Sequence, residues 1–389
     1  MELTSINQHY RMGIASSLSE IGREQWENLL NTQSHYNPFL SYVFLNALHE
    51  SQCASKTSGW QPCFITIWEN AELVGVYPLY QKMHSYGEYV FDWAWAQAYE
   101  RYGFSYYPKL LSAIPFTPVT GGRAIAKNKV IQELMIEIQK KMTLTDQFSS
   151  CHTLFLPEDD VDLYRKAGFL IRTGVQFHWE NQNYHNFDEF LATLSSKKSK
   201  NIRAERRKIR DQGISFRHIS GAEASEEDWR FFKYCYDLTY SNHHSTPYLN
   251  LDFFLRIGAE MPENIFLIFA FKDEKKIAAS FLIHDNENLY GRYWGCTETL
   301  PCLHFETAYY QAIELCIKKK IMVFEGGAQG EHKMARGFLP KKTWSAHLLA
   351  RPEFSDAVAL FLNRETNGVE LYIDELNQHT PYKKDIYPI

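Results

Sequence analysis

The chain has 389 residues, of which 45% are hydrophobic, 22% charged and 15% aromatic, and its formal net charge is −5. This length exceeds what one hydrophobic core usually serves, so we expect two domains in a soluble globular protein. The small negative charge excludes a global electrostatic attraction to nucleic acid or to an anionic membrane, so any such binding must be local.

The seven cysteines are odd in number and include no CxxC pair, a pattern typical of reduced thiols and not of a structural zinc site. The N-terminal segment lacks the basic start and long apolar run of a secretory signal. No apolar run approaches the roughly 20 residues that a membrane helix needs. We therefore expect a cytoplasmic protein with no bound metal and no integral membrane association.

The chain contains two copies of one pattern of elements. Residues 37–41 (NPFLS), followed by Phe44, return as residues 246–250 (TPYLN), followed by Phe253. Each copy predicts a proline turn, an N-cap and an amphipathic helix. Runs of β-branched and aromatic residues then predict three antiparallel strands in each copy. These strands are expected at 63–68, 73–80 and 89–95, and again at 265–271, 277–284 and 289–295.

A second set of matches follows each group of strands. Apolar residues at helical spacing predict helices at 128–142 and 304–319. Each helix precedes a short strand (152–156 or 321–325), a short helix that ends in Gly-Phe, and a final strand that carries His178 or His347. The predicted order in both copies is helix, three strands, helix, strand, short helix, strand.

This order resembles the GNAT acyltransferase fold, and two copies in one chain resemble the tandem arrangement of the Fem-type aminoacyl transferases of cell-wall synthesis. We therefore expect an α/β protein of the α+β type with mixed sheets, built from two tandem GNAT-like domains. The first domain is expected at 1–180, with an insertion at 97–123 that the second copy lacks, and the second domain at 181–389.

A basic helix at 195–212 is expected to open the second domain. Between Lys197 and Arg210 eight residues are basic and one is acidic, while Ile202 and Ile209 share one side of the helix. The helix is either a solvated element packed through its isoleucines or a surface for the phosphates of a nucleotide, coenzyme A or transfer RNA. The candidate phosphate-binding residues are Lys197, Lys198, Lys200, Arg203, Arg206 and Arg207.

Residues 85–103 (SYGEYVFDWAWAQAYERYG) and 106–123 (YYPKLLSAIPFTPVTGGR) resemble a bacterial family of peptidoglycan biosynthesis or recognition proteins, related to Fem-type and GNAT acyltransferases. Residues 37–48, the basic helix and residues 324–349 resemble this family too. The resemblance implies transfer of an acyl or aminoacyl group from acyl-CoA or aminoacyl-tRNA to an amine, with no tightly bound cofactor. Residues 296–302 (CTETLPC) depart from the GNAT loop that holds the coenzyme A pyrophosphate, which argues against acetyl-CoA as the donor.

The glycine-rich turn after the strand 321–325 is the first candidate site. By analogy with GNAT proteins, the donor would enter where the strands 289–295 and 321–325 part. In our hypothesis Glu325 or Glu331 is the general base, and His332 or Tyr293 is the proton donor. The expected substrate contacts in this turn are Gly326, Gly327, Gln329, Lys333 and Arg336, the last two pairing with phosphate or carboxylate. The same residues would also suit an ordinary exposed loop.

The block 85–123 is the second candidate site, for the acceptor. Asp92 either points to solvent from an alternating strand or faces a cleft as an acid. Together with Trp93, Tyr107, Lys109 and Arg123 it would form the wall of an acceptor pocket.

Other chemistries find less support in the sequence. The pairs His243–His244 and Glu331–His332 lack a recognised metal-ligand spacing, and the apolar neighbours of Cys296 and Cys302 would keep thiols protonated. We expect an N-acyltransferase on an amine acceptor, which the family resemblance links to peptidoglycan precursors. The alternatives are an acyl-CoA-dependent N-acetyltransferase on a small metabolite or protein amine, and a non-catalytic protein that binds cell-wall precursor or RNA.

Overall fold

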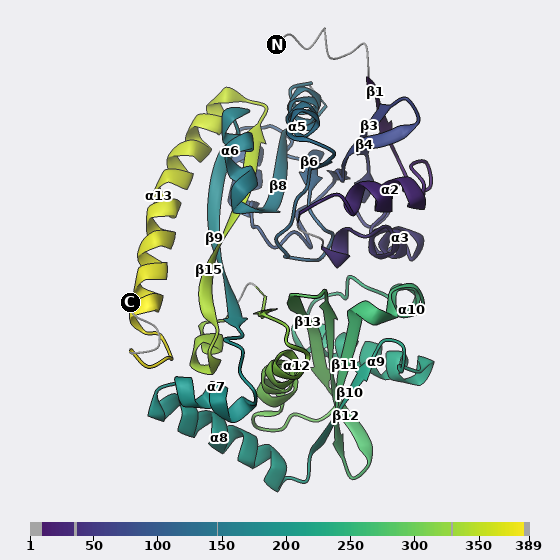
Figure 1. Ribbon diagram of the computed structural model, residues 1–389. Helices are drawn as coiled ribbons and strands as arrows, with labels where there is room; N and C mark the ends of the chain where they lie inside the picture. The colour runs from purple at the N-terminus through teal and green to yellow at the C-terminus, as the bar shows by residue number, and fades with distance from the viewer. Residues whose placement is uncertain (1–9, 35–36, 146, 328–329, 385–389) are drawn as a thin grey trace. The chain divides into compact units, whose positions relative to one another are not determined.

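The computed structural model describes residues 10–34, 37–145, 147–327 and 330–384 (Figure 1). Its chain divides into two compact units that are not consecutive halves. Unit 1 comprises the residues up to Gly174 together with Lys342–Val369, and unit 2 comprises Val175–Lys341 together with the residues from Glu370 onward. Strands β9 (Leu170–Glu180) and β15 (Leu339–Leu349) and helix α13 (Pro352–Gln378) each begin in one unit and end in the other. Independently folding domains at 1–180 and 181–389 stay a prediction.

Unit 1 contains two β-sheets. The first is antiparallel with the order β1-β3-β4-β7, and the second has the order β15-β8-β6-β5-β2, in which β6 and β8 run parallel and the other neighbours antiparallel. The elements are β1 (Tyr10–Ala15), α2 (Arg23–Leu30), η1 (Pro38–Leu40), α3 (Tyr42–Glu50), β2 (Trp60–Pro62), β3 (Phe64–Glu69), β4 (Glu72–Tyr77), β5 (Tyr80–Lys82), α4 (Trp93–Arg101), β6 (Lys109–Ser112), β7 (Ile125–Ala126), α5 (Lys129–Thr143), β8 (Ser150–Leu156) and α6 (Glu158–Lys166).

Alternation along β3 separates the two faces of the first sheet. Ile65 belongs to a buried cluster with Ile131 and Leu134 of α5, whereas the ring of its neighbour Phe64 lies 6.0 Å from that of Trp26 in α2. Successive side chains of a strand point to opposite faces, so helices cover both sides of this sheet. The second sheet is equally buried, because every residue of β8 is buried.

Unit 2 has one mixed sheet with the order β10-β11-β12-β13-β14-β9, antiparallel except for the parallel pair of β13 and β14. Its elements are α7 (Phe187–Thr193), α8 (Ser196–Asp211), β10 (Ser215–Ser220), α9 (Glu226–Asn242), α10 (Leu251–Glu260), η2 (Pro262–Asn264), β11 (Ile265–Lys272), β12 (Lys275–His284), β13 (Asn288–Cys296), α11 (Leu303–Phe305), the π-turn η3 (Glu306–Tyr310), α12 (Gln311–Lys319), β14 (Val323–Glu325) and η4 (Glu331–Arg336).

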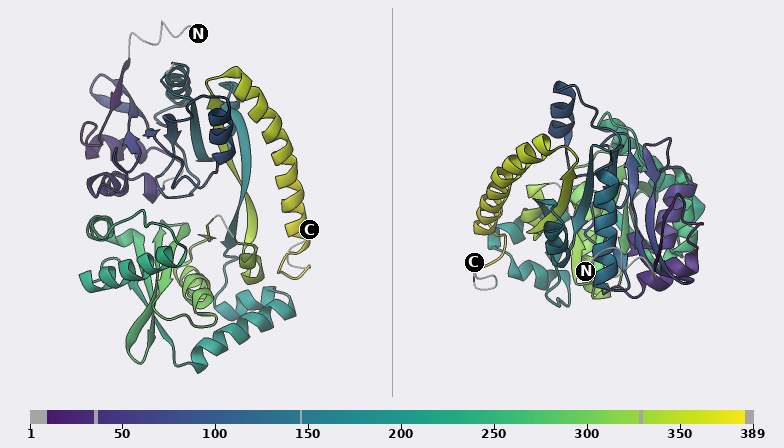
Figure 2. Two further views of the ribbon diagram at one scale, coloured as in Figure 1. Left: turned by 180° about the vertical axis from the view of Figure 1, so that it is seen from behind. Right: turned by 90° about the horizontal axis from the view of Figure 1, so that it is seen from above.

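Helices cover both faces of the unit 2 sheet (Figure 2). The ring of Phe281 in β12 lies 5.4 Å from that of Phe232 in α9, while its neighbour Leu282 joins a buried cluster with Ala312 and Ile313 of α12. Strand alternation therefore assigns α9 to one face and α12 to the other. Below, these are called the α9 face and the α12 face.

The helix starts predicted from the sequence are confirmed. The side chains of Ser41, Asn128 and Asn250 each accept a hydrogen bond from a backbone N–H in the first turn of α3, α5 and α10. Such caps satisfy donors that a helix leaves unpaired at its start. The basic helix α8 is confirmed as well, and its two isoleucines, Ile202 and Ile209, are buried.

The strand expected at 89–95 is wrong. Residues from Trp93 onward form helix α4, in which Trp95 and Tyr99, four residues apart, are the buried side chains. The alternation of tryptophan and alanine imitated a strand over a window too short to exclude a helix. The third antiparallel strand is instead β6, which pairs with β5 and lies inside the stretch expected to be an insertion.

No helix within the described ranges is both long enough and apolar enough to span a membrane.

Candidate functional site

Strands β13 and β14 part after a short parallel stretch, as the analogy with GNAT proteins implied. They pair only where residues 288–290 face residues 323–325, and β13 continues beyond this stretch to Cys296. Glu325 is the last paired residue of β14, with Tyr290 as its neighbour on β13 and His178 as its neighbour on β9. A carboxyl group therefore lies at the point where the two strands separate.

Glu325 shares one face of the sheet with Tyr293. Its neighbour Phe324 belongs to the cluster under α12, so Glu325 points to the α9 face. There the ring of Tyr293 lies 4.9 Å from that of Tyr236 in α9. An irregularity of register between Phe281 and Leu282 places both Tyr290 and Tyr293 on this face.

The pKa of Glu325 suits a general base. Burial raises its pKa to about 8, although the nearby Arg292 opposes this shift, and Asp285 adds to it. A base is most effective when its pKa lies near the working pH, because it then accepts a proton readily while a useful fraction of it is in the basic form.

The residues of η4 are placed differently from the sequence prediction. Arg336 is buried, donates to both carboxylate oxygens of Glu205 at 2.9 and 3.1 Å, and holds the backbone oxygen of His332 at 2.8 Å. Lys333 is 4% exposed and donates to the backbone oxygen of Gly327 at 3.2 Å, and burial lowers its pKa to about 8. Both cations bind groups of the protein itself. The sequence prediction had them pair with a phosphate or carboxylate of the substrate.

His332 does not lie beside Glu325, because it contacts a residue on the opposite face of the sheet. His332 is exposed, and its Nε2 lies 3.3 Å from the hydroxyl of Tyr309, which belongs to the cluster on the α12 face. Burial and the neighbouring Lys333 and Arg336 lower the pKa of His332. The side chain of Glu331 and all of Gln329 lie outside the described residues.

Two glycines of this turn are required by the fold. A Cβ on Gly326 would lie 2.7 Å from the ring of Phe338, and Gly327 has a φ of 83°, which side chains rarely tolerate. The amide of Gly326 also donates to the backbone oxygen of Phe177 at 3.1 Å. The predicted approach of a ligand to these amides is therefore not needed to explain the glycines.

A pocket of about 320 Å³ lies where β13 ends and α11 begins. Its wall is mainly apolar and includes Trp294, Cys296, Leu300, Leu303 and His304. The ring of His304 stacks on that of Trp294 at 4.3 Å, and burial lowers the pKa of His304 to about 4. An apolar pocket with a few polar groups is the usual form of a small-molecule site.

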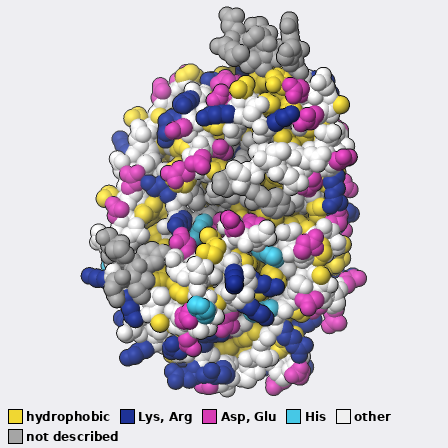
Figure 3. Space-filling model, viewed as in Figure 1, with side chains coloured by type: hydrophobic (Ala, Val, Ile, Leu, Met, Phe, Trp, Pro, Cys, Tyr) yellow, Lys and Arg dark blue, Asp and Glu magenta, His cyan; other side chains and the backbone are white. Residues whose placement is uncertain are grey.

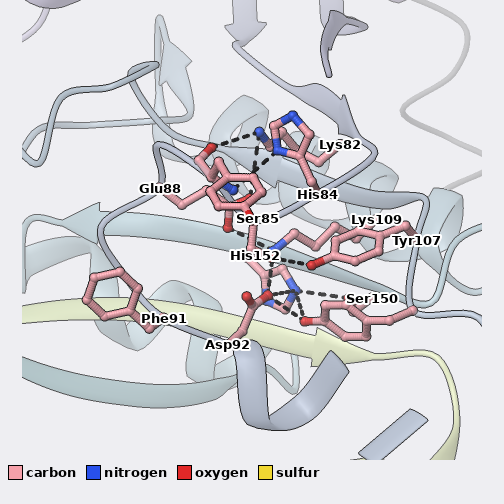
Figure 4. Close-up of polar contacts among 12 residues, drawn as sticks. Lys82, His84, Ser85, Glu88, Phe91, Asp92, Tyr107, Lys109, Ser150 and His152 are labelled. Carbon is pink, nitrogen blue, oxygen red and sulfur yellow. Dashed lines mark hydrogen bonds and ion pairs between the residues drawn. The ribbon is translucent and has the colours of Figure 1, made fainter. Parts of the chain in front are cut away.

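A buried charge network in unit 1 occupies the second candidate region (Figure 4). Lys109 of β6 is fully buried, and its Nζ donates to Asp92, to Glu88 at 2.8 Å and to Ser85 at 2.8 Å. A second lysine, Lys82, lies with its Nζ 3.8 Å from Glu88 and 3.7 Å from the ring centre of Trp60. The side chain of Phe91 points away from this network. We name Lys82, Ser85, Glu88, Asp92 and Lys109 the lysine network.

Burial and the attraction between opposite charges together set the pKa values in the lysine network. Burial alone would lower the pKa of Lys109, but Glu88 and Asp92 hold it above its ordinary value. Burial alone would raise the pKa of Asp92, but Lys109 holds it well below its ordinary value. Burial brings the pKa values of Glu88 and Lys82 to about 7 each. Among the described residues, no donor reaches Glu88 Oε1 or Asp92 Oδ1, so each can accept another hydrogen bond.

The other predicted acceptor residues separate into two groups. Tyr107 is half-buried, its hydroxyl lies 2.8 Å from Ser85, and it lines a pocket of about 620 Å³ in unit 1. Trp93 is 37% exposed and packs on Tyr86. Arg123 is fully buried, and its guanidinium donates to the backbone oxygens of Leu154, Gly121 and Val119. Arg123 therefore fastens the backbone instead of lining a pocket.

The basic helix α8 presents most of its cations to solvent. Figure 3 shows Lys and Arg side chains gathered along the lower edge, where α8 lies in Figure 1. Lys197, Lys200 and Arg207 are exposed, and Lys198 is half-buried. Arg203 pairs with Asp188 at 2.7 Å. Arg206 differs from the prediction, because it is bound by Glu306 and Glu314 at 3.0 and 2.8 Å and helps to attach α8 to α12.

Replacing Lys197, Lys200, Arg207 and Arg210 together by glutamine tests the phosphate-binding prediction. If these exposed cations contact phosphates, affinity for a single-stranded RNA falls, and the slope of log Kobs against log salt becomes shallower by about 3, roughly 0.7 for each lost contact. Fluorescence anisotropy at several salt concentrations measures both. The matched control replaces the exposed lysines 56, 127, 129 and 141 of unit 1. Equal binding by the two quadruple variants would exclude α8 as the binding surface.

Several residues of the lysine network escaped the sequence prediction. Glu88 and Ser85 lie in the quoted block but show no spacing that marks a site, and Lys82 precedes it. His152 and His347 were noticed only as parts of repeated strands. Within the described residues, no group of three or more His, Cys, Asp or Glu side chains is arranged to hold a metal ion.

Comparison with solved structures shows the fold. FemX matches 86% of this chain and 98% of its own length at 10% identity and a TM-score of 0.53. The C-terminal domain of a putative lysylphosphatidylglycerol synthetase from Agrobacterium fabrum matches 90% of this chain and 97% of its own at 8% identity and a TM-score of 0.53. L-PGS from Bacillus licheniformis matches 88% and 97% at 11% identity and a TM-score of 0.53. The expected mixed α/β fold is confirmed.

No curated protein matches the chain in sequence. The model of the FemAB-like family, described as peptidoglycan biosynthesis/recognition, matches residues 17–384. This match spans nearly the whole chain and confirms the resemblance seen in residues 85–123. The chain therefore belongs to the FemAB-like family of peptidoglycan biosynthesis/recognition proteins.

Proposed function

We propose that this protein transfers an acyl or aminoacyl group to an amine, with Glu325 as the general base. One observation carries the proposal: a carboxyl with a pKa of about 8 lies at the end of β14, where β13 and β14 part. Membership of the FemAB-like family indicates a transferase, and it favours an acceptor amine on a peptidoglycan precursor.

The proposed reaction is aminolysis of an activated carbonyl. The nitrogen of the neutral acceptor amine bonds to the carbonyl carbon, and Glu325 takes the proton that this nitrogen loses. The bond from this carbon to the oxygen or sulfur of the donor breaks, and the leaving atom takes a proton. Tyr293 is the proposed source of this proton, since it shares the α9 face with Glu325.

The proposed donor is an aminoacyl ester carried by transfer RNA. The activated end would lie beside Glu325, where β13 and β14 part, and the exposed cations of α8 would contact the phosphate backbone. Acyl-CoA is the alternative donor, but residues 296–302 lack the glycine loop that would bind its pyrophosphate. Both donors are made in the cytoplasm, so we infer that the protein works there.

The proposed acceptor contacts are those of unit 1. Tyr107 lines a pocket of unit 1, and the buried Lys109 positions the hydroxyl of this tyrosine through Ser85. A peptide stem offers polar groups that suit this hydroxyl. Trp93 and Tyr86 offer aromatic surface beside it.

A direct transfer assay tests the proposal. The protein is incubated with an aminoacyl-tRNA or an acyl-CoA and with a peptidoglycan stem peptide, and the new amide is detected by mass spectrometry. We expect product with aminoacyl-tRNA. Product with acyl-CoA alone would favour the alternative enzyme, together with a raised unfolding temperature in the presence of coenzyme A. If neither donor yields an amide but the precursor or RNA binds, the protein is a binding protein.

A further inference from the structure

A line of buried side chains continues from the lysine network into the core of unit 1. The hydroxyl of Tyr106 donates to Asp92 Oδ2 at 2.7 Å and lies 3.0 Å from Nε2 of His152. The Nδ1 atoms of His152 and His347 are 2.8 Å apart, and Nε2 of His347 is 2.8 Å from Ser345 Oγ. All five residues are buried. None of them contributes to the proposed chemistry at Glu325.

The geometry admits one direction for these hydrogen bonds. Tyr106 gives its only proton to the ionised Asp92, so its oxygen must accept the proton of His152 Nε2. A neutral imidazole carries one N–H, so His152 Nδ1 is an acceptor and His347 Nδ1 must donate to it. Ser345 then donates to His347 Nε2. Ser150 Oγ, 2.9 Å from His152 Nε2, is a second acceptor for the same proton.

The surroundings keep both imidazoles neutral, as this direction requires. Burial lowers the pKa of His152 to about 3, with Lys109 and Arg172 acting in the same direction and Asp92 against them. Burial also places the pKa of His347 well below its ordinary value, assisted by His152, Arg172 and Lys109 and opposed by Asp92. The indole of Trp95 packs on both rings, at 5.9 and 5.0 Å between centroids.

The repeat shows which residues of unit 2 occupy the positions that correspond to these histidines. His152 of β8 faces His347 of β15, just as Glu325 of β14 faces His178 of β9 in unit 2. The parallel neighbour β6 accompanies β8 in the way that β13 accompanies β14. Unit 1 therefore has an imidazole where unit 2 has its candidate base, and this imidazole is linked to Asp92 through the hydroxyl of Tyr106.

We propose that Tyr106, His152 and His347 are positioning residues, joined in an oriented hydrogen-bond chain that holds Asp92 as an anion against Lys109. Every proton in the chain points toward Asp92, so the dipoles add up and stabilise its negative charge. Lys109 is thereby kept in place against Ser85, which contacts Tyr107, the side chain that faces the acceptor in the proposed function, on which this role rests.

The chain predicts the tautomers of both histidines. Nuclear magnetic resonance of the full-length protein with ¹⁵N-labelled histidine should show His152 protonated on Nε2 and His347 on Nδ1, assigned with His152→Gln and His347→Gln. In the double variant Tyr106→Phe, Ser150→Ala, His152 loses both acceptors of its Nε2 proton, so both rings should lose their single tautomer, including His347, which neither residue touches. Tyr99→Phe is the matched control, because it removes a hydroxyl from the same aromatic cluster but outside the chain.

Two results would overturn the proposal. The direction is wrong if His152 carries its proton on Nδ1 in the unaltered protein, or if the double variant changes neither ring while circular dichroism shows a native fold. The positioning role is tested separately in the transfer assay, where Tyr106→Phe should raise the KM for the acceptor several-fold and leave the KM for the donor unchanged. An unchanged acceptor KM would refute the role. Absence of transfer by the unaltered protein would refute the proposed function instead, with the tautomers still measurable.

Discussion

Replacing Glu325 by glutamine is expected to lower the rate of transfer by a factor of about 10²–10⁴, the range that general-base catalysis usually contributes. Glutamine keeps the size of the side chain but cannot accept the amine proton. Because burial raises the pKa of Glu325 to about 8, the rate of the unaltered protein should rise with pH through this value as the carboxylate forms. The variant should lose this rise. Initial rates of amide formation between pH 6 and 9 measure both effects.

Two further variants make this prediction specific. Glu180→Gln is the matched control, because Glu180 ends the neighbouring strand β9, pairs with Lys341 and should leave the rate unchanged. Arg292 favours the charged form of Glu325, so Arg292→Met should raise the pKa further and move the rise in rate to higher pH. A full rate in Glu325→Gln, or a pH profile that Arg292→Met does not move, would assign the base elsewhere.

Replacing Lys109 by methionine is expected to lower the free energy of unfolding by about 3–5 kcal/mol, the usual loss when one partner of a buried ion pair is removed. The change keeps an unbranched side chain of similar length but leaves Glu88 and Asp92 without their main cation. Urea denaturation followed by tryptophan fluorescence and circular dichroism gives the difference, and coincidence of the two signals shows whether one transition is observed.

The matched control and the pH dependence separate charge from packing. Lys127→Met breaks an exposed pair with Glu72, so it should lower the free energy of unfolding much less than Lys109→Met does. In Lys109→Met the pKa values of both buried carboxyls rise above their unfolded values, so protonation relieves the destabilisation as the pH falls. The loss should therefore be smaller at pH 5 than at pH 8. A loss equal to that of Lys127→Met, or one independent of pH, would contradict the buried network.

Local features of the fold followed from the sequence because their causes are local. Ser41, Asn128 and Asn250 cap helices through backbone donors three residues away, which requires no tertiary contact. The buried stripe of Ile202 and Ile209 follows from helical periodicity alone. The strand expected at 89–95 failed because a few alternating residues satisfy both periods, and only the packing of Trp95 and Tyr99 selects the helix.

The candidate site was predictable only in part. Glu325 could be selected because it ends an apolar strand before a glycine-rich turn, and the structure agrees that it lies where β13 and β14 part. Lys333 and Arg336 resemble ligand-binding cations in the sequence, yet their partners, Gly327 and Glu205, are found only by folding. A charge near a turn does not reveal whether its partner is a ligand or the protein itself.

The sequence by itself determined the repeated order of elements, the capped helix starts and the basic face of α8, since each depends on residues within one or two turns of chain. Only the tertiary structure decided that Lys109, Asp92 and His152 meet, because they come from β6, from the residue before α4 and from β8. Burial then changes their chemistry, since removal of water makes each charge depend on its neighbours. The same holds for Glu325, whose residue type is written in the sequence but whose pKa is set by the sheet around it.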